Sequence, residues 1–214
     1  MRIGILGSGL MGGKLGTLFA RAGHDVVFSY ARSKAKLQRL ARGTNGNARA
    51  GTPREAATYA EVVLLAVHWS RLDDVLKQAG DLSGKIIVSC SLPMNTDDTA
   101  LVFGRETSGA EELARRLPDS RVVAAFTTVP SEVLFGVFEA RRKRTRPNLV
   151  HCGDDEPAKK IAAGLIRDLA LTQSTRGPLR ITRYTEPFSL LIGQLAYEGS
   201  ESPALAYRLE RFAE

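Results

Sequence analysis

The sequence predicts an α/β protein built on a doubly wound, mostly parallel sheet. Three observations support this prediction. A glycine-rich turn separates the first apolar run from the first amphipathic segment. Apolar and amphipathic segments then alternate along the chain, as they do in a parallel sheet covered by helices. The later apolar runs contain almost no polar residues, which is typical of strands buried on both faces.

The first two predicted elements flank a GxGxxG pattern formed by Gly7, Gly9 and Gly12. We expect a strand over Arg2 to Leu6 and a helix over Leu10 to Ala22. At such a junction the first glycine allows a sharp turn, the second lets a pyrophosphate approach the backbone, and the third lets helix and strand pack closely. The pattern predicts a Rossmann-type dinucleotide site with the phosphates at the helix N-terminus. A turn that only packs the helix on the strand is the alternative.

The remaining elements continue the alternation. Strands are expected at Asp25 to Ser29, Ala48 to Ala50, Glu61 to Val67, Lys85 to Ser89 and Arg121 to Ala125, with edge strands at Leu149 and Val150 and at Leu169 to Thr172. Helices are expected over Ser33 to Arg42, from Thr52 onward, over Ala158 to Arg167 and over Glu186 to Tyr197. Thr52, followed by Pro53 and then by Glu55, indicates a helix N-terminus. The acids of Asp154 to Glu156 are interpreted as another helix N-terminus rather than as metal ligands.

The residues at the end of the second predicted strand indicate which dinucleotide binds. An NAD site places an acid there, whose carboxylate accepts a hydrogen bond from the ribose 2′-hydroxyl. This chain has Ser29, Arg32, Ser33 and Lys34 instead, and the nearest acid, Asp25, stands at the beginning of the strand. Hydroxyl donors and cations suit a 2′-phosphate, which a carboxylate would repel. We therefore predict NADP. The alternative for Arg32 and Lys34 is a pair of solvated charges on a surface helix.

Other candidate site residues follow the apolar runs, because a ligand lies across the carboxyl ends of the strands in an open parallel sheet. We expect Ser8, Leu10 and Met11 on the pyrophosphate loop, and Val67, His68, Trp69, Leu92, Pro93 and Val129 around the nicotinamide. His68 is either a general acid or a hydrogen-bonding wall residue. The pattern identifies no acid–base pair.

Composition limits the classes of function. With 43% hydrophobic and 25% charged residues among 214, the chain is an ordinary globular protein without an apolar run of membrane-spanning length. Its two cysteines and three histidines show no metal-ligand spacing, and we expect no leader and a cytoplasmic location. Five of its 30 Lys and Arg residues lie in one run, Arg141 to Arg146. This basic run is interpreted first as a solvated loop, then as a clamp for an acidic cofactor tail, and last as a nucleic-acid patch.

The length of the chain suits one domain. We predict a single NADP-binding Rossmann domain over residues 1–214, in which residues 178–214 form a C-terminal helical extension. The stretch Glu186 to Tyr197 carries much apolar surface. It is therefore either the dimerisation helix of a homodimer or a helix packed on the domain's own core.

Six segments match the motifs of one enzyme family in the order in which that family carries them. They are Gly7 to Gly12, Ser29 to Lys34, Val63 to Trp69, Ala125 to Pro130, Cys152 to Asp155 and Gly177 to Arg183. In these segments the chain resembles the reductases that pass hydride between NADP(H) and the deazaflavin coenzyme F420, together with their NADPH-dependent ferric and flavin reductase relatives. The resemblance implies a Rossmann-type fold, the use of NADP, and F420 or a flavin as the second substrate.

These observations predict an NADP(H)-dependent oxidoreductase that transfers hydride between NADPH and a planar deazaflavin (coenzyme F420) or flavin co-substrate. Such a reaction requires the protein to hold two flat molecules in contact and to exclude water, without a nucleophile. The alternative is a non-catalytic NADP(H)-binding sensor or partner-docking module. The expected partners are a small-molecule co-substrate and a second copy of the chain, with no membrane and no nucleic acid.

Overall fold

The computed structural model describes residues 1–142, 146–198 and 202–210. Its strands are β1 (Arg2–Leu6), β2 (Asp25–Ser29), β3 (Ala48–Ala50), β4 (Val62–Leu65), β5 (Ile86–Ser89), β6 (Arg121–Ala124), β7 (Asn148–Gly153) and β8 (Thr172–Gly177). Within the described residues these strands form one sheet in the order β3-β2-β1-β4-β5-β6-β7-β8. Neighbouring strands are parallel except β6 and β7, which are antiparallel. The doubly wound, mostly parallel sheet predicted from the sequence is confirmed.

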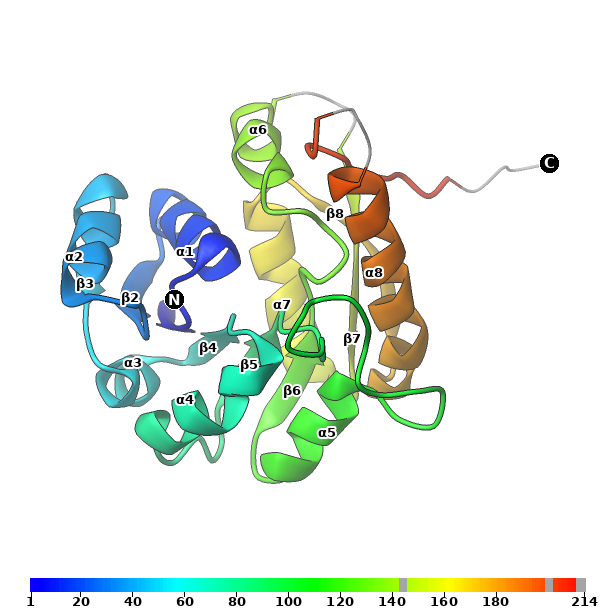
Figure 1. The fold of residues 1–214 in the computed structure, drawn as a ribbon. Coiled ribbons are helices and arrows are strands. Elements are labelled where there is room, and N and C mark those ends of the chain that lie inside the picture. Colours follow the sequence, from blue (N-terminus) through cyan, green and yellow to red (C-terminus); the bar gives the residue numbers. More distant parts are fainter. Residues whose placement is uncertain (143–145, 199–201, 211–214) are drawn as a thin grey trace.

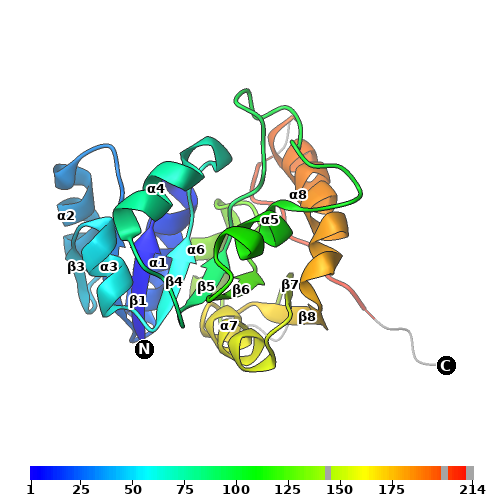
Figure 2. The same cartoon turned by 90° about the horizontal axis from the view of Figure 1, so that it is seen from below.

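Helices cover both faces of this sheet (Figure 1). They are α1 (Leu10–Arg21), α2 (Lys34–Gly43), α3 (Pro53–Tyr59), α4 (Leu72–Ala79), α5 (Gly109–Arg116), α6 (Val133–Glu139), α7 (Glu156–Asp168) and α8 (Thr182–Tyr197), with the 3-10 turns η1 (Trp69–Arg71) and η2 (Leu179–Ile181). One hydrophobic core lies under α1, α2, α6 and α7, and a second lies under α3, α4 and α5. Figure 2 shows α4 and α5 on one side of the sheet and α7 on the other. The helix α8 lies beside β7 and β8, far from α2 and β3 (Figure 1).

The central strand β4 explains why the sequence shows an uninterrupted apolar run there. Val62 and Leu64 belong to one core, whereas Val63 and Leu65 belong to the other. All four side chains are at most 1% exposed. Successive side chains of a strand point to opposite faces, so a strand with a core on each side needs apolar residues at every position.

Two predicted helix starts are confirmed by their capping bonds. At the start of α3, the Thr52 hydroxyl accepts from the Glu55 N–H at 3.2 Å, and the Glu55 carboxylate accepts from the Thr52 N–H at 2.6 Å. The hydrogen bonds that the Glu55 carboxylate accepts from the Thr52 N–H and from the Thr52 hydroxyl hold the pKa of Glu55 below its usual value. At the start of α7, Asp155 accepts from the Ala158 N–H at 2.7 Å. Each acid therefore satisfies a backbone donor that its helix leaves free.

The last predicted strand was placed wrongly. Residues 169–171 are buried at the end of α7, and Ala170 has a φ of +61°, which turns the chain. The strand β8 begins at Thr172, which pairs with Asn148 of β7. The apolar residues pack into the core at the helix end, whereas the edge strand is polar and carries no apolar pattern that a sequence analysis would recognise.

The residues after α8 fold back onto the sheet. The Tyr207 hydroxyl lies 2.7 Å from the Thr128 hydroxyl, just after β6. The Tyr207 ring packs edge-on against Phe188 of α8 at a centroid distance of 5.1 Å, and its carbonyl accepts from the Asn148 N–H at 2.9 Å. One segment thus connects α8, β7 and the loop after β6.

The outer face of α8 is apolar and uncovered. Tyr184, Leu191 and Leu195 are 70%, 49% and 61% exposed. Their spacing of seven and four residues places them on one face of the helix. None of the helices in the described residues is long and apolar enough to cross a membrane. The homodimer and the cytoplasmic location stay predictions.

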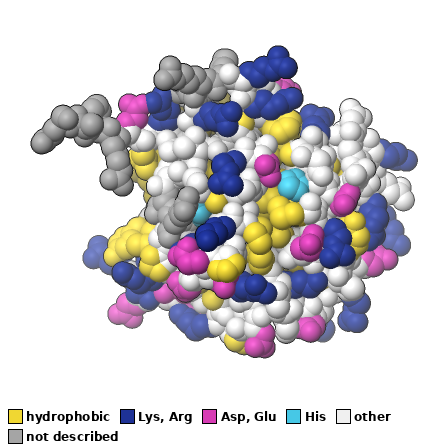
Figure 3. All heavy atoms as spheres, turned by 180° about the vertical axis from the view of Figure 1, so that it is seen from behind, with side chains coloured by type: hydrophobic (Ala, Val, Ile, Leu, Met, Phe, Trp, Pro, Cys, Tyr) yellow, Lys and Arg dark blue, Asp and Glu magenta, His cyan; other side chains and the backbone are white. Residues whose placement is uncertain are grey.

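The basic run is only partly described, because Lys143 and Arg144 lie outside the described residues. The Arg141 guanidinium lies over the Phe138 ring at 4.8 Å, and Arg146 donates to the Arg141 carbonyl at 2.9 Å. On the face that Figure 3 shows, Lys and Arg side chains are scattered among acids rather than gathered into one patch.

Candidate functional site

The turn between β1 and α1 shows why each glycine of the GxGxxG pattern is needed. Gly7 has a φ of +108°, and a Cβ there would lie 2.3 Å from the Ala66 carbonyl oxygen. A Cβ on Gly12 would lie 1.9 Å from the Gly7 carbonyl oxygen. A Cβ on Gly9 would meet nothing within 4 Å, so the space above this residue is open. Two glycines are required by packing, and the third faces the space that a ligand would occupy.

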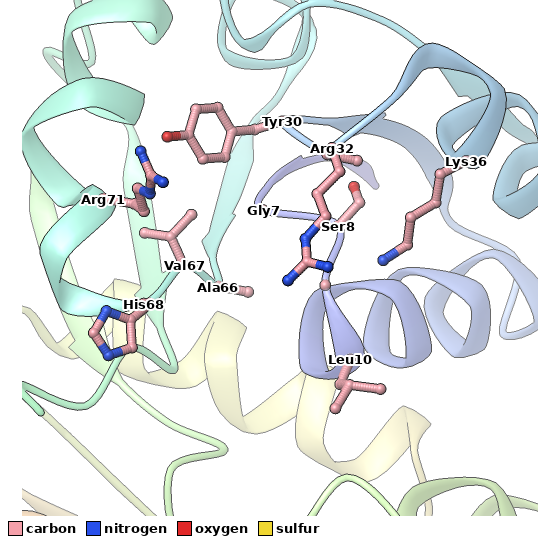
Figure 4. Close-up of a pocket in the computed structure, with 12 residues that line it drawn as sticks. Gly7, Ser8, Leu10, Tyr30, Arg32, Lys36, Ala66, Val67, His68 and Arg71 are labelled. Atoms are coloured by element: carbon pink, nitrogen blue, oxygen red, sulfur yellow. The ribbon is translucent and has the colours of Figure 1, made fainter. Parts of the chain in front are cut away.

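A cleft of about 640 Å³ opens over this turn (Figure 4). It is lined by Gly7, Ser8, Gly9, Leu10, Tyr30, Ala31, Arg32, Lys36, Ala66, Val67, His68 and Arg71. Side-chain capping of α1 is absent within the described residues, so its first N–H groups are available to an anion. We refer to this space as the cleft.

Three cations line the cleft, and its described lining contains no carboxylate. Figure 4 shows Arg32, which follows β2, and Lys36, on α2, directing their nitrogen atoms toward the space over Ser8. Arg71 lies on the opposite side, near Tyr30. A cleft with this charge suits a ligand with several phosphate groups.

Tyr30 lines one side of the cleft and forms a hydrogen bond with a nearby acidic residue. Its hydroxyl donates to the Asp74 carboxylate on α4. Burial, helped by Asp74, raises the pKa of Tyr30 to about 12, and the same hydrogen bond lowers the pKa of Asp74. Asp74 therefore bonds to Tyr30 and does not line the cleft as a partner for a ribose hydroxyl.

Three residues expected at a 2′-phosphate lie elsewhere. Ser29 is fully buried and donates its hydroxyl to the Ile5 carbonyl at 2.7 Å, so it joins two strands. The Ser33 hydroxyl accepts from the Lys36 N–H at 3.3 Å and caps α2. Lys34 is exposed and does not line the cleft, whereas Lys36 does. Two residues along a helix correspond to a rotation of about 200°, which places these two lysines on different sides of α2.

A second cavity of about 230 Å³ adjoins the cleft along Ala66, Val67 and His68. Its other lining residues are Met11, Cys90, Ser91, Leu92, Met94 and Asp98. We refer to this cavity as the chamber. Burial raises the pKa of the Cys90 thiol to about 12, so this thiol stays protonated and is a poor nucleophile. Five of the nine described residues that line the chamber are apolar.

His68 stands between the cleft and the chamber, and both of its ring nitrogens have partners. Nδ1 accepts from the Ser70 N–H at 3.2 Å and lies 2.8 Å from the Ser70 hydroxyl. Because a backbone N–H can only donate, the ring proton resides on Nε2, which donates to Asp98 at 3.0 Å. His68 thus lines both cavities with both ring nitrogens engaged, and its role as a general acid or as a wall residue stays a prediction.

Of the other residues expected near the nicotinamide, some line the chamber and others pack away from it. Val67 and Leu92 line the chamber. Met11, which was expected on the pyrophosphate loop, also lines the chamber and not the cleft. Trp69, Pro93 and Val129 do not line the described cleft or chamber. Trp69 packs on Phe103 at 5.6 Å, Pro93 is buried against Gly109, and Val129 is 2% exposed in the core. Ser8 lines the cleft, although its hydroxyl donates to the Ser29 carbonyl at 2.8 Å.

Comparisons with known proteins place the chain in a family. A family model described as NADP oxidoreductase, coenzyme F420-dependent, matches residues 2–93. The F420-dependent NADP reductase of Methanocaldococcus jannaschii is 30% identical over 208 residues, which cover 90% of this chain and 92% of that reductase. The chain belongs to the F420-dependent NADP oxidoreductase family. Metalloreductase STEAP3 of Rattus norvegicus is 28% identical over 189 residues, which cover 88% of this chain but only 36% of that larger protein.

Solved structures share the fold of this F420-dependent NADP oxidoreductase family member. A crystal structure from Arthrobacter sp. FB24, of a protein proposed to be an F420-dependent NADP reductase, superposes with a TM-score of 0.85. It is 21% identical, and the match covers 99% of this chain and 100% of the other. A reductive aminase from Aspergillus terreus in complex with NADPH4, cyclohexanone and allyl amine superposes with a TM-score of 0.66 at 16% identity. That match covers 91% of this chain and 61% of the aminase.

Sequence analysis of this family member did not select the tyrosine or three of the charged residues that the structure brings to the site. Tyr30, Lys36 and Arg71 line the cleft, and Asp98 lines the chamber. Helical periodicity from Ser33 would have distinguished Lys36 from Lys34. Asp98 lies on a long loop after β5, and no local pattern connects that loop to His68, which is 30 residues earlier.

Proposed function

We propose that this protein binds NADP(H) in the cleft and transfers hydride between NADPH and a planar deazaflavin, such as coenzyme F420, or a flavin. The observation that carries the proposal is the charge of the cleft: Arg32, Lys36 and Arg71 line it, and no described lining residue is an acid. A ribose 2′-phosphate gains from this arrangement, whereas a ribose 2′-hydroxyl lacks its usual carboxylate partner.

The residues present fit the dinucleotide in its other parts. The open space over Gly9 and the uncapped N-terminus of α1 suit the pyrophosphate. The chamber continues the cleft past Ala66 and Val67, at the carboxyl end of β4, where a nicotinamide would extend. When bound, NADPH supplies the hydride. The task of Met11, Leu92 and Met94 is to hold the reacting rings in contact and to exclude water.

Nucleotide binding tests the proposal with a matched pair of lysines. Lys36→Ala and Arg32→Ala should each weaken NADPH at least about tenfold while leaving NADH nearly unchanged, since a charge-assisted phosphate bond contributes about 1.5 to 3 kcal/mol. Lys34→Ala removes the same charge from the same helix, but outside the cleft, and should change neither affinity. Titration calorimetry with both nucleotides checks this. Equal losses for NADPH and NADH would contradict the assignment.

Turnover tests the second half of the proposal. Purified protein mixed with NADPH and either F420 or a flavin should oxidise the NADPH. The fall in NADPH absorbance measures this reaction. Tight NADPH binding without oxidation by any planar acceptor would instead favour the non-catalytic sensor.

A homodimer through α8 belongs to the same proposal. The exposed face of Tyr184, Leu191 and Leu195 supports it, because apolar faces of this kind on soluble proteins commonly mark a contact with a partner.

A further inference from the structure

The loop between β5 and α5 contains a hairpin, formed by residues 93–102. Met94 and Leu101 pair as an antiparallel bridge between its two limbs. The Val102 N–H donates to the Pro93 carbonyl at 2.8 Å, at the base of the hairpin. We refer to residues 93–102 as the hairpin.

Asn95 closes the turn of the hairpin from inside. Its N–H donates to the Ala100 carbonyl at 2.9 Å, and its side-chain oxygen accepts from the N–H groups of Thr99 and Ala100 at 2.9 and 3.2 Å. Its side-chain nitrogen donates to the Thr99 hydroxyl at 2.9 Å. Asparagine side chains fix turns by bonding nearby backbone groups in this way. The limbs and the turn thus form one connected unit.

The hairpin supplies one part of the wall of the chamber. Met94, on its first limb, and Asp98, in its turn, line the chamber. The other described lining residues belong to α1 or follow β4 and β5. No described residue of the hairpin lines the cleft. A displacement of the hairpin would therefore change the chamber and leave the cleft as it is.

Phe103, the residue after the hairpin, attaches it to η1. Its ring packs edge-on against Trp69, with the ring centroids 5.6 Å apart, which is a favourable aromatic geometry. Among the described residues, Phe103 belongs to neither hydrophobic core, whereas Trp69 packs on the core under α3, α4 and α5. The ring of Phe103 thus connects a loop to a residue that the core supports.

Trp69 is a fixed support for this contact. The Arg116 guanidinium of α5 lies over the Trp69 ring at 5.6 Å and forms an ion pair with Asp73 of α4. Two helices and the core therefore hold the indole in place. This position gives Trp69 an indirect link to the chamber, although it does not line it.

We infer that Phe103 and Trp69 are positioning residues for the second substrate: their contact holds the hairpin against the chamber, where the hairpin bounds the acceptor. This inference rests on the proposed function. Without the contact, the hairpin lies against the chamber for a smaller fraction of the time, and the apparent affinity for the acceptor falls by that fraction. The affinity for NADPH stays the same, because the hairpin does not contribute to the described lining of the cleft.

Two variants at different places on the loop test the inference. Phe103→Ala removes the ring that packs on Trp69. Asn95→Ala removes the oxygen that closes the turn, and Asn95 lines neither the cleft nor the chamber. Phe103→Tyr keeps an aromatic ring and is the conservative substitution. Val102→Ala is the matched control, because it shortens the neighbouring apolar side chain, which is 47% exposed.

The fluorescence of Trp69 reports the contact without any substrate, because Trp69 is the only tryptophan of the chain. Quenching by acrylamide measures how accessible the indole is. The quenching constant should increase in Phe103→Ala, which removes the ring, and in Asn95→Ala, in which the hairpin no longer holds that ring on the indole. Phe103→Tyr and Val102→Ala should keep the wild-type value.

Turnover measures the effect on the acceptor. F420 or FMN takes up a hydride from NADPH and a proton from water, and NADP⁺ is left. Phe103→Ala and Asn95→Ala should each raise the KM of the acceptor by about three- to tenfold, with a smaller change in kcat. The dissociation constant of NADPH should be the same in all variants. Phe103→Tyr and Val102→Ala should keep the wild-type KM.

The outcomes separate the inference from the proposed function. If an acceptor is reduced with the same KM in the wild type and all variants, the positioning role is wrong while the oxidoreductase stands. If Phe103→Ala weakens NADPH as much as the acceptor, Phe103 acts on the whole fold and the inference is also wrong. If the wild type binds NADPH and reduces neither F420 nor FMN, the hydride transfer of the proposed function is overturned, and the inference with it.

Discussion

The Glu186 carboxylate on α8 accepts a hydrogen bond from the backbone N–H of Gly109 at 3.0 Å, so one helix caps another. The second carboxylate oxygen accepts from the Ala110 N–H, also at 3.0 Å. Next to this pair, the Ser108 and Thr182 hydroxyls lie 2.6 Å apart. These contacts attach α8 to the first turn of α5, where a negative charge is favourable, but they require a buried carboxylate.

Stability should therefore fall as pH rises. Burial raises the pKa of Glu186 from 4.5 to about 7, against the effect of the two N–H groups. A raised pKa in the folded state contributes stability that is complete below about pH 4.5 and lost as pH rises through about 7. Urea unfolding at about pH 5 and about pH 8 should differ by on the order of 1 to 3 kcal/mol from this group. In Glu186→Gln that part of the difference should vanish; an unchanged difference would argue against this origin.

Gly9 and Gly12 should respond differently to the same substitution. Gly12→Ala places a Cβ 1.9 Å from a carbonyl oxygen and should lower the free energy of unfolding by more than about 2 kcal/mol. Gly9→Ala places its Cβ in open space and should keep stability within about 1 kcal/mol. It should nevertheless weaken NADPH, because the methyl group occupies the approach to the pyrophosphate. Thermal unfolding and NADPH titration of both variants measure the two effects, and similar behaviour of the two would refute the division of roles.

Ser29→Ala should affect stability rather than nucleotide choice. The hydroxyl is buried and donates to Ile5, so its loss should cost about 0.5 to 1.5 kcal/mol. The ratio of NADPH to NADH affinity should stay as in the wild type. A selective loss of NADPH binding would restore Ser29 to the phosphate site.

The capping box of α3 gives a stability prediction away from the site. Thr52→Ala removes an acceptor for the Glu55 N–H and should lower the free energy of unfolding by about 1 kcal/mol. Thr58 is exposed in the same helix, so Thr58→Ala should change the free energy of unfolding by less than about 0.5 kcal/mol. Thermal unfolding of the pair checks the cap, and equal effects would rule it out.

The proposed dimer predicts an effect at α8. Leu195→Glu places a charge on the apolar face and should convert a dimer to a monomer in sedimentation equilibrium, with little effect on NADPH binding. A wild-type protein that sediments as a monomer would show that the face has another function.

Most of the fold could be predicted from the sequence, because short local patterns indicate most of its strands and the glycine turn. Continuous apolar runs indicated β4, β5 and β6, and the glycine turn placed α1 against β1. Local sequence patterns failed to predict features that depend on contacts between residues distant in the chain. The polar edge strand β8 has no apolar pattern, and the direction of the Ser29 side chain depends on its register with β1. Asp98 reaches the site only because a long loop folds back onto His68 and Trp69.

The contacts of Tyr207 make the segment after α8 part of the protein's architecture. Shortening the chain before this residue would uncover the Phe188 ring and leave the Thr128 hydroxyl and the Asn148 N–H without their partners. A truncation or label intended to be neutral there would loosen α8 and the loop after β6 together. Residues 202–210 thus connect the helix that we propose joins two subunits to β7 and to the loop after β6.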